Sequence, residues 1–202
     1  LNEVIFEKPS SLTSIGHGSF YECSSLQKIK IPATVVKLGD NVFAGCSSLI
    51  EIEIEDSSEL KSIENEAFKN CSKLIEISIP TSVESICENT FRGCSSLKQV
   101  KFENPSSIKS IESYAFKDCS SLSEIKIHSS VNAIETCSFK GCKKLEKISF
   151  EGQSSLIKIG KESFCECPLL MQFLIPSSVK IIDESAFNRC LSLIRISIPS
   201  SV

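Results

Sequence analysis

Apolar residues recur along this chain at offsets that are the same in every copy of one pattern. Each copy has two apolar residues three apart, then a Phe, a Cys three residues later, and a Leu-x-x-Ile-x-Ile type of run. A spacing rule that returns about every two dozen residues indicates a solenoid, in which each repeat forms one coil. Two successive copies are Val83-x-x-Ile86 with Phe91-x-x-Cys94-x-x-Leu97-x-x-Val100-x-Phe102, and Ile108-x-x-Ile111 with Phe116-x-x-Cys119-x-x-Leu122-x-x-Ile125-x-Ile127.

The Phe-x-x-Cys element marks each repeat and sets its length. The cysteines follow one another at steps of 23, 25, 23, 25, 23, 25 and 23 residues. Short repeats leave the final run through Ile-Pro, as at Ile31-Pro32, and long ones leave through an acidic, Ser-rich turn, as at 102–107. About eight repeats of 23 or 25 residues are therefore predicted. Their markers are Phe20/Cys23, Phe43/Cys46, Phe68/Cys71, Phe91/Cys94, Phe116/Cys119, Phe139/Cys142, Phe164/Cys167 and Phe187/Cys190.

Each coil is predicted to have three sides. The final run, such as 26–31, alternates apolar and polar positions and contains β-branched residues, which is typical of a half-buried strand. Nine such strands, counting 1–6, would stack into a parallel sheet about 40 Å long at roughly 4.8 Å a strand. A second, more irregular extended segment follows, as at 83–86. The third side is expected to hold one helical turn, because the chain must reverse there within few residues.

Length and charge narrow the interpretation further. A single coil cannot bury both of its flanks, so repeats are stable only when stacked, and residues 1–202 are predicted to form a single domain. The pattern starts and stops partway through a repeat, which favours a fragment of a longer protein. A net charge of -3 provides no field that would attract nucleic acid or an anionic membrane. No run of 18 apolar residues is present to cross a bilayer.

The repeat Cys-x-x-Leu-x-x-Ile-x-Ile-Pro-x-Ser-Val-x-x-Ile-x-x-x-Ala-Phe-x-x-Cys resembles the leucine-rich repeat of the BspA-like (Treponema pallidum-type) class over essentially the whole chain. Departures are small: His128 replaces an expected Pro, and the Gly expected after the turn Ile is kept only at Gly16, Gly39 and Gly160. The resemblance implies an α/β, right-handed, curved solenoid with the parallel sheet on its concave face. It also implies a surface protein of a bacterium or a parasitic protist, of a kind associated with adhesion to host matrix proteins and cells.

Eight of the eleven cysteines occupy the position just before the strand. A thiol there acts as a small apolar filler and weak hydrogen-bond donor. Side chains in register point the same way rather than at each other, which is poor disulfide geometry. A reduced structural ladder is therefore predicted, and the odd total excludes complete pairing within one chain. The ladder comprises Cys23, Cys46, Cys71, Cys94, Cys119, Cys142, Cys167 and Cys190.

Cys87, Cys137 and Cys165 fall in columns that are polar in the other coils, so they are expected at or near the surface. Cys137 and Cys165 lie on adjacent coils. The sequence leaves two alternatives open: a bond or metal contact between the two thiols, or no interaction between them. Zinc needs a closed set of about four ligands. With only His17 and His128, on separate coils, no metal site is predicted, and no cofactor.

Catalysis finds little support in the sequence. A nucleophile needs a base and an orienting group within reach, and neither histidine recurs near a matched Ser or Cys. No phosphate-binding Gly-rich loop is present. The sequence therefore favours a binding scaffold over an enzyme.

Strand positions between the inward residues are expected to face outward from the sheet. Their charges alternate in sign from coil to coil, and such cross-strand pairs stabilise each other by about 0.2–1 kcal/mol without any ligand. The alternative is that they contact a partner. The residues concerned are Lys28, Lys30, Glu51, Glu53, Lys98 and Lys101.

At the far end, Met171, Leu174 and Ile194 form an outward apolar group with Arg195 beside them. An exposed apolar group rimmed by polar residues is typical of a contact surface. The alternative is that coils beyond this fragment shield it.

Two functions remain. One is a cell-surface or secreted adhesion or recognition solenoid that binds a protein, such as an extracellular-matrix or host-cell protein, along its concave sheet. The other is an intracellular, cytoplasmic scaffold of the same shape, which the free thiols slightly favour. Neither would bind nucleic acid or contact a membrane through this segment. The uncapped terminal coils also predict end-to-end self-association.

Overall fold

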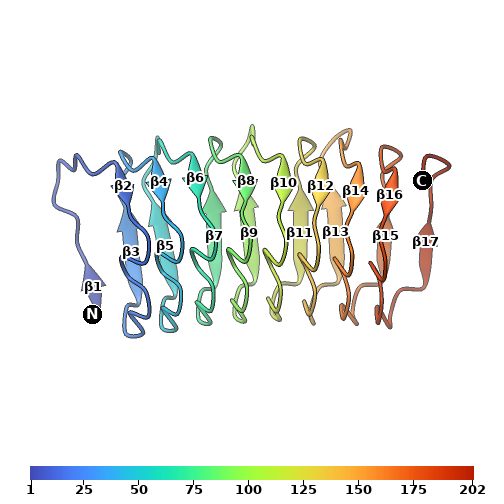
Figure 1. Cartoon of the computed structure of the whole chain (residues 1–202), viewed down its shortest axis with the longest axis horizontal. Helices are drawn as coiled ribbons and strands as arrows, with labels where there is room; N and C mark the ends of the chain where they lie inside the picture. The colour runs from blue at the N-terminus through green and yellow to red at the C-terminus, as the bar shows by residue number, and fades with distance from the viewer.

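The computed structural model describes all residues from Leu1 to Val202. The coils follow one another in chain order, so the two termini lie at opposite ends of the stack (Figure 1). Odd-numbered and even-numbered strands form two separate sides. The odd-numbered strands are β1 (Glu3–Val4), β3 (Lys28–Ile31), β5 (Glu51–Ile54), β7 (Glu76–Ile79), β9 (Gln99–Phe102), β11 (Glu124–Ile127), β13 (Lys147–Phe150), β15 (Gln172–Leu174) and β17 (Arg195–Ser197). The nine predicted parallel strands are confirmed.

The even-numbered strands form the irregular extended side and have two residues each. They pair in parallel in two groups, β2 to β6 and β8 to β16. They are β2 (Ser14–Ile15), β4 (Lys37–Leu38), β6 (Ser62–Ile63), β8 (Ser85–Ile86), β10 (Ser110–Ile111), β12 (Ala133–Ile134), β14 (Lys158–Ile159) and β16 (Ile181–Ile182).

Pairing between the odd-numbered strands follows the alternation of repeat lengths. Across a 23-residue step, β3 and β5 pair over four residues, from Lys28↔Glu51 to Ile31↔Ile54. Across a 25-residue step, β13 and β15 pair only at Lys147↔Gln172, and neither β5 with β7 nor β9 with β11 forms a ladder. The two extra residues of a long repeat lie in the turn between such strands. We call these 25-residue steps, which include β1 to β3, seams.

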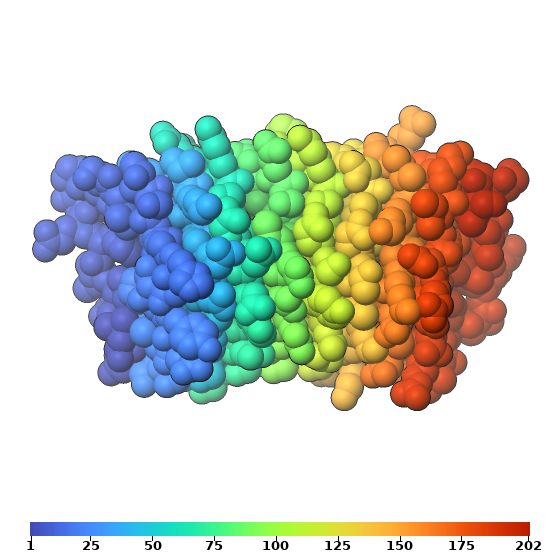
Figure 2. All heavy atoms as spheres, in the orientation of Figure 1, coloured from blue at the N-terminus to red at the C-terminus, as the bar shows by residue number.

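The core is a set of columns in which like residues lie above like. The rings of Phe68, Phe91 and Phe116 stack with centroids 5.4 and 5.3 Å apart, in the single row that the repeat predicts. Forty-eight buried residues, chiefly hydrophobic, form one contiguous cluster from coil to coil. In the space-filling view the coils follow each other without a break (Figure 2).

The predicted helical turn is wrong. The chain before and after each Phe forms turns in which successive backbone N–H groups alternate between two acceptors. The N–H of Lys69 binds its own coil at Glu66, whereas the N–H groups of Phe68 and Asn70 bind carbonyls of the next coil. Glu66 and Asn70 both have a φ of 59°, in the left-handed region. A helix satisfies every N–H internally, so this alternation replaces helix with inter-coil bonding. No helix of the length and apolarity needed to cross a membrane occurs.

Candidate functional site

The eight cysteines before the strands lie in one column. Six are buried, and Cys23 and Cys190 are half-buried. From Cys46 onward, each Sγ donates a hydrogen bond of 3.1 or 3.2 Å to the backbone carbonyl oxygen of the Phe in the preceding coil. All eleven thiols are free. The column therefore links neighbouring coils as well as filling space between them.

Burial disfavours ionisation of these thiols. Desolvation of the thiolate raises the pKa of Cys46 to about 12 and that of Cys190 to about 11. The pKa values of the fully covered thiols between them are raised in the same direction. Because the thiolate is the nucleophile and the metal ligand, such thiols are poorly suited to chemistry.

Two of the three remaining cysteines lie deeper than predicted. Cys137 and Cys165 are buried, only 7% and 3% exposed, and Cys87 is half-buried. Polar residues in the same columns, such as Lys140, reach solvent with long side chains, whereas a thiol is too short to do so. Burial raises the pKa of both Cys137 and Cys165, and the Sγ of Cys137 lies 3.9 Å from Oε2 of Glu162.

The two histidines lie apart from each other and from the thiols. His17 is exposed. His128 is half-buried; its Nδ1 lies 2.8 Å from Oγ of Ser130 and accepts the backbone N–H of the same residue at 3.2 Å. No group of three or more His, Cys, Asp or Glu side chains is close enough to hold a metal ion. His128 thus stabilises the turn in which it lies.

The predicted charged residues of the sheet face mostly bind one another across strands. Exposed ion pairs contribute about 0–1 kcal/mol each and need no ligand. Lys98 is exposed and forms no ion pair. The pairs are Lys28–Glu51 at 2.6 Å, Lys30–Glu53, and Lys101–Glu76 at 3.2 Å.

The predicted apolar group comes together on the last two strands of the sheet. Met171, Leu174 and Ile194 are 50%, 75% and 91% exposed. Gln172 pairs with Arg195, and the N–H of Ile194 binds the carbonyl oxygen of Met171 at 3.4 Å, so the two apolar side chains are neighbours. Arg195 is exposed and forms no ion pair. This face combines uncovered apolar area with an unpaired cation.

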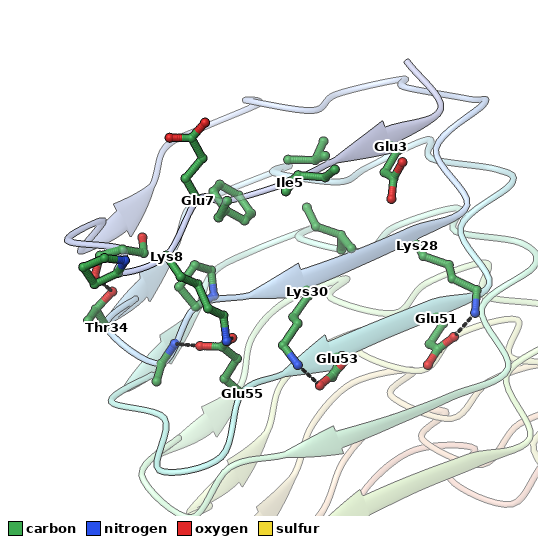
Figure 3. A pocket seen from close by; sticks show the side chains of 17 residues that line it. Glu3, Ile5, Glu7, Lys8, Lys28, Lys30, Thr34, Glu51, Glu53 and Glu55 are labelled. Carbon is green, nitrogen blue, oxygen red and sulfur yellow. Dashed lines mark hydrogen bonds and ion pairs between the residues drawn. The ribbon is translucent and has the colours of Figure 1, made fainter.

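Two grooves were not foreseen from the sequence, and each lies at a seam. The N-terminal groove, of about 730 Å³, is lined by residues 3–10, 28–30, 32–34, 51, 53 and 55 (Figure 3). The β13–β15 groove, of about 760 Å³, is lined by residues 147–150, 152–154, 172 and 174–178, and so includes Leu174. The alternation of 23 and 25 residues marks the four seams in the sequence, and it does not tell which two of them carry a groove.

A stack of near-identical coils that presents a parallel sheet defines a repeat scaffold, a class that generally mediates protein binding. The chain belongs to the BspA-type leucine-rich repeat family. The model of that family's repeat region, described as six copies, matches residues 1–105 and again residues 101–202. The resemblance read from the sequence is thus confirmed.

The solved structures of the T. pallidum and pneumococcal proteins show the same fold. The leucine-rich repeat protein of T. pallidum is 31% identical, with a TM-score of 0.71 over 81% of this chain and 74% of that one. The pneumococcal vaccine antigen PcpA is 27% identical, with a TM-score of 0.59 over 94% of this chain and 54% of that one. A leucine-rich cell surface protein of Faecalibacterium prausnitzii is 24% identical, with a TM-score of 0.43 over 95% and 72%. No curated protein matches significantly.

Proposed function

We propose that residues 1–202 form one domain that acts as the protein-binding scaffold of a cell-surface adhesion or recognition protein. The partner, a protein of the extracellular matrix or of a host cell, docks on the outward, concave face of the odd-numbered sheet. The main contact is made by the residues at the β15–β17 end of the sheet, which are Met171, Leu174, Ile194 and Arg195. The charged pairs formed by Lys28, Lys30 and Lys101 border the interface at its other end, and Lys98 lies between.

The observation that carries the proposal is the apolar group on β15 and β17. Met and Arg are enriched at protein interfaces, whereas Lys and Glu are depleted there. The ion pairs elsewhere on the face already satisfy each other, so a partner gains little by replacing them. Burying Leu174 and Ile194, in contrast, removes apolar area from water at about 25 cal/mol per Å². A role as a protein-binding scaffold is general in this family, and adhesion is the additional function that we propose.

The test is capture of purified extracellular-matrix proteins by the immobilised chain, with dissociation constants measured by surface plasmon resonance. We expect at least one to bind, and the variant Met171→Ser/Leu174→Ser/Ile194→Ser to bind roughly tenfold or more weakly, because truncated hot-spot residues cost over 1 kcal/mol each.

The matched control is Ile50→Ser/Ile75→Ser, which removes two exposed apolar residues from the same face at other coils. This variant should keep its affinity. Equal losses in both variants would place the contact elsewhere on the sheet, and capture that is unaffected by either would exclude this face.

The second candidate is an intracellular scaffold of the same shape. The eleven free thiols favour it, because free thiols persist in reducing compartments. Antibody labelling of intact and permeabilised cells separates the two candidates. Labelling of intact cells supports the adhesion protein, and labelling only after permeabilisation supports the scaffold.

A further inference from the structure

The N-terminal groove exists because two neighbouring strands separate. β1 pairs with β3 only at Glu3↔Lys28 and Val4↔Ile29. β3 then continues for two residues in register with β5, while the chain after β1 turns away. A second groove lies at another seam in the interior, between β13 and β15, so a groove of this kind is not confined to the first coil.

Contacts between neighbouring coils fix the residues that line the groove. Lys8, in the turn after β1, lies 2.6 Å from Oε1 of Glu55 two coils away, and this contact lowers the pKa of the Glu55 carboxyl. Glu55 also accepts the backbone N–H of Ala33 at 3.1 Å. Thr34 donates its hydroxyl to the carbonyl oxygen of Leu12 at 2.8 Å. These contacts therefore hold the turn after β1 and the turn after β3 in place without a ligand.

The lining carries a surplus of negative charge on one wall. It contains five carboxylates and three lysines, and each lysine is bound to a carboxylate: Lys8 to Glu55, Lys28 to Glu51, and Lys30 to Glu53. Glu3 and Glu7 are exposed and have no ion-pair partner. Figure 3 shows Lys28 and Lys30 directed toward Glu51 and Glu53, away from the wall formed by β1.

An apolar side chain lies between the two free carboxylates. Ile5 is 76% exposed, whereas its neighbours Val4 and Phe6 are half-buried. Alternate residues of an extended segment face the same side, so Glu3, Ile5 and Glu7 present one outward row. An apolar residue flanked by carboxylates complements an apolar residue flanked by cations.

We infer that the N-terminal groove binds an extended peptide segment of a partner protein, in which an apolar residue has Lys or Arg two positions before and two positions after it. The segment lies along the wall formed by β1, with its apolar side chain against Ile5 and its cations at Glu3 and Glu7. This site is separate from the apolar group on β15 and β17, and it does not depend on the function proposed for that group.

The test uses three fluorescein-labelled peptides with Gly-Ser ends and the centres Lys-Ser-Ile-Ser-Lys, Lys-Ser-Ser-Ser-Lys and Glu-Ser-Ile-Ser-Glu. They are called the Lys-Ile-Lys, Lys-Ser-Lys and Glu-Ile-Glu peptides after their alternate residues, which face the same side of an extended segment. Fluorescence anisotropy measures their binding to the intact chain at low and high salt. The Lys-Ile-Lys peptide should bind most tightly and weaken with salt, because exposed charges are screened. The Lys-Ser-Lys peptide should bind more weakly and the Glu-Ile-Glu peptide not at all.

The decisive variant is Glu3→Gln/Glu7→Gln, which removes both free carboxylates from exposed positions. We expect it to weaken binding of the Lys-Ile-Lys peptide by roughly 2- to 30-fold, the range for two exposed ion pairs. The control is Glu124→Gln/Glu146→Gln, which removes two exposed, unpaired carboxylates of the same face outside the groove. It should bind as the parent chain does. Equal weakening in both variants, equal binding of the acidic peptide, or no binding of the Lys-Ile-Lys peptide would each overturn the inference.

Discussion

The thiol of Cys94 donates a 3.1 Å hydrogen bond to the backbone carbonyl oxygen of Phe68 in the preceding coil. That oxygen also accepts the backbone N–H of Cys71 at 3.1 Å. A carbonyl oxygen has two lone pairs, so the thiol satisfies the second. The same relationship recurs from Cys46 to Cys167, and it explains why a cysteine rather than an alanine suits this column.

Cys94→Ala should lower the free energy of unfolding by about 1–3 kcal/mol, because it leaves a small cavity and removes a buried hydrogen bond. Urea denaturation followed by circular dichroism measures the loss. The matched control is Cys23→Ala in the same column, where the thiol is half-buried and donates no hydrogen bond. Its loss should be smaller, and equal losses would show that the inter-coil bond contributes nothing.

Stability should fall at alkaline pH. In the unfolded chain a thiol ionises near its ordinary pKa of about 8.5, whereas burial raises the pKa of Cys46 to about 12 in the folded chain. The contribution of this group is therefore complete below about pH 8.5 and is lost as the pH rises toward 12. Each such thiol contributes a slope of up to about 1.4 kcal/mol per pH unit.

Urea midpoints measured with reductant from neutral to alkaline pH test this dependence. Cys46→Ala should reduce the slope in the alkaline range and leave it unchanged near neutral pH. A slope that is the same with and without the Cys46 thiol would contradict its protection in the folded chain.

The sequence correctly predicts the structural features that follow directly from the spacing of the repeats. The single row formed by Phe68, Phe91 and Phe116 follows from equal spacing, because equal positions in stacked coils lie above one another. The helical turn was wrong because residue spacing does not tell which acceptor an N–H group chooses. In this fold, N–H groups such as that of Asn70 bind the next coil.

The site was only partly predictable for a related reason. Met171 and Ile194 were placed together correctly, since both occupy the same outward column on adjacent strands. The N-terminal groove depends instead on where the ladder between β1 and β3 stops, which no single residue type marks. The burial of Cys165 was not predicted because its position holds Lys or Arg in other coils. Those long side chains reach solvent even where the backbone lies below the surface, whereas a thiol does not.

Thiol modification should follow the observed depths and not the polarity of the columns. Iodoacetamide should modify the half-buried Cys23 and Cys87 in the folded chain, whereas Cys137 and Cys165 should react only after unfolding. Peptide mass spectrometry after brief exposure gives the order. If Cys165 were modified as fast as Cys87 is, the result would support the surface position that the sequence predicts for Cys165.

Ser138→Ala should stabilise the chain. The Ser138 hydroxyl is fully buried and has no hydrogen-bond partner, and Ala occupies the same column at Ala67 and Ala115. Removing an unsatisfied hydroxyl should raise the free energy of unfolding by about 1 kcal/mol. The control is Thr90→Ala, because the hydroxyl of Thr90 donates to the carbonyl oxygen of Cys87 at 2.8 Å. This second variant should lower stability. A lower stability of Ser138→Ala, or a higher stability of Thr90→Ala, would contradict the assignment.

When residues 1–202 are produced alone, the coil that contains β17 should drive self-association. Leu191 and Ile198 are 82% and 60% exposed, and Phe187, which stacks on Phe164, is only half-buried. Within residues 1–202, β17 pairs with β15 alone. An exposed apolar edge strand recruits another chain by strand pairing. We therefore expect sedimentation velocity to detect species larger than the monomer as concentration rises.

Charges placed on that edge should abolish the association. Leu191→Lys/Ile198→Lys should sediment as a monomer, because both positions lie beside the edge strand β17 and burying a Lys in a contact there is costly. The control is Ile157→Lys, at a residue that is 49% exposed on an interior coil, away from the edge. It should associate as the parent chain does. A parent chain that stays monomeric at high concentration would contradict the prediction, and loss of association in the control alone would move the contact from the end of the stack to its side.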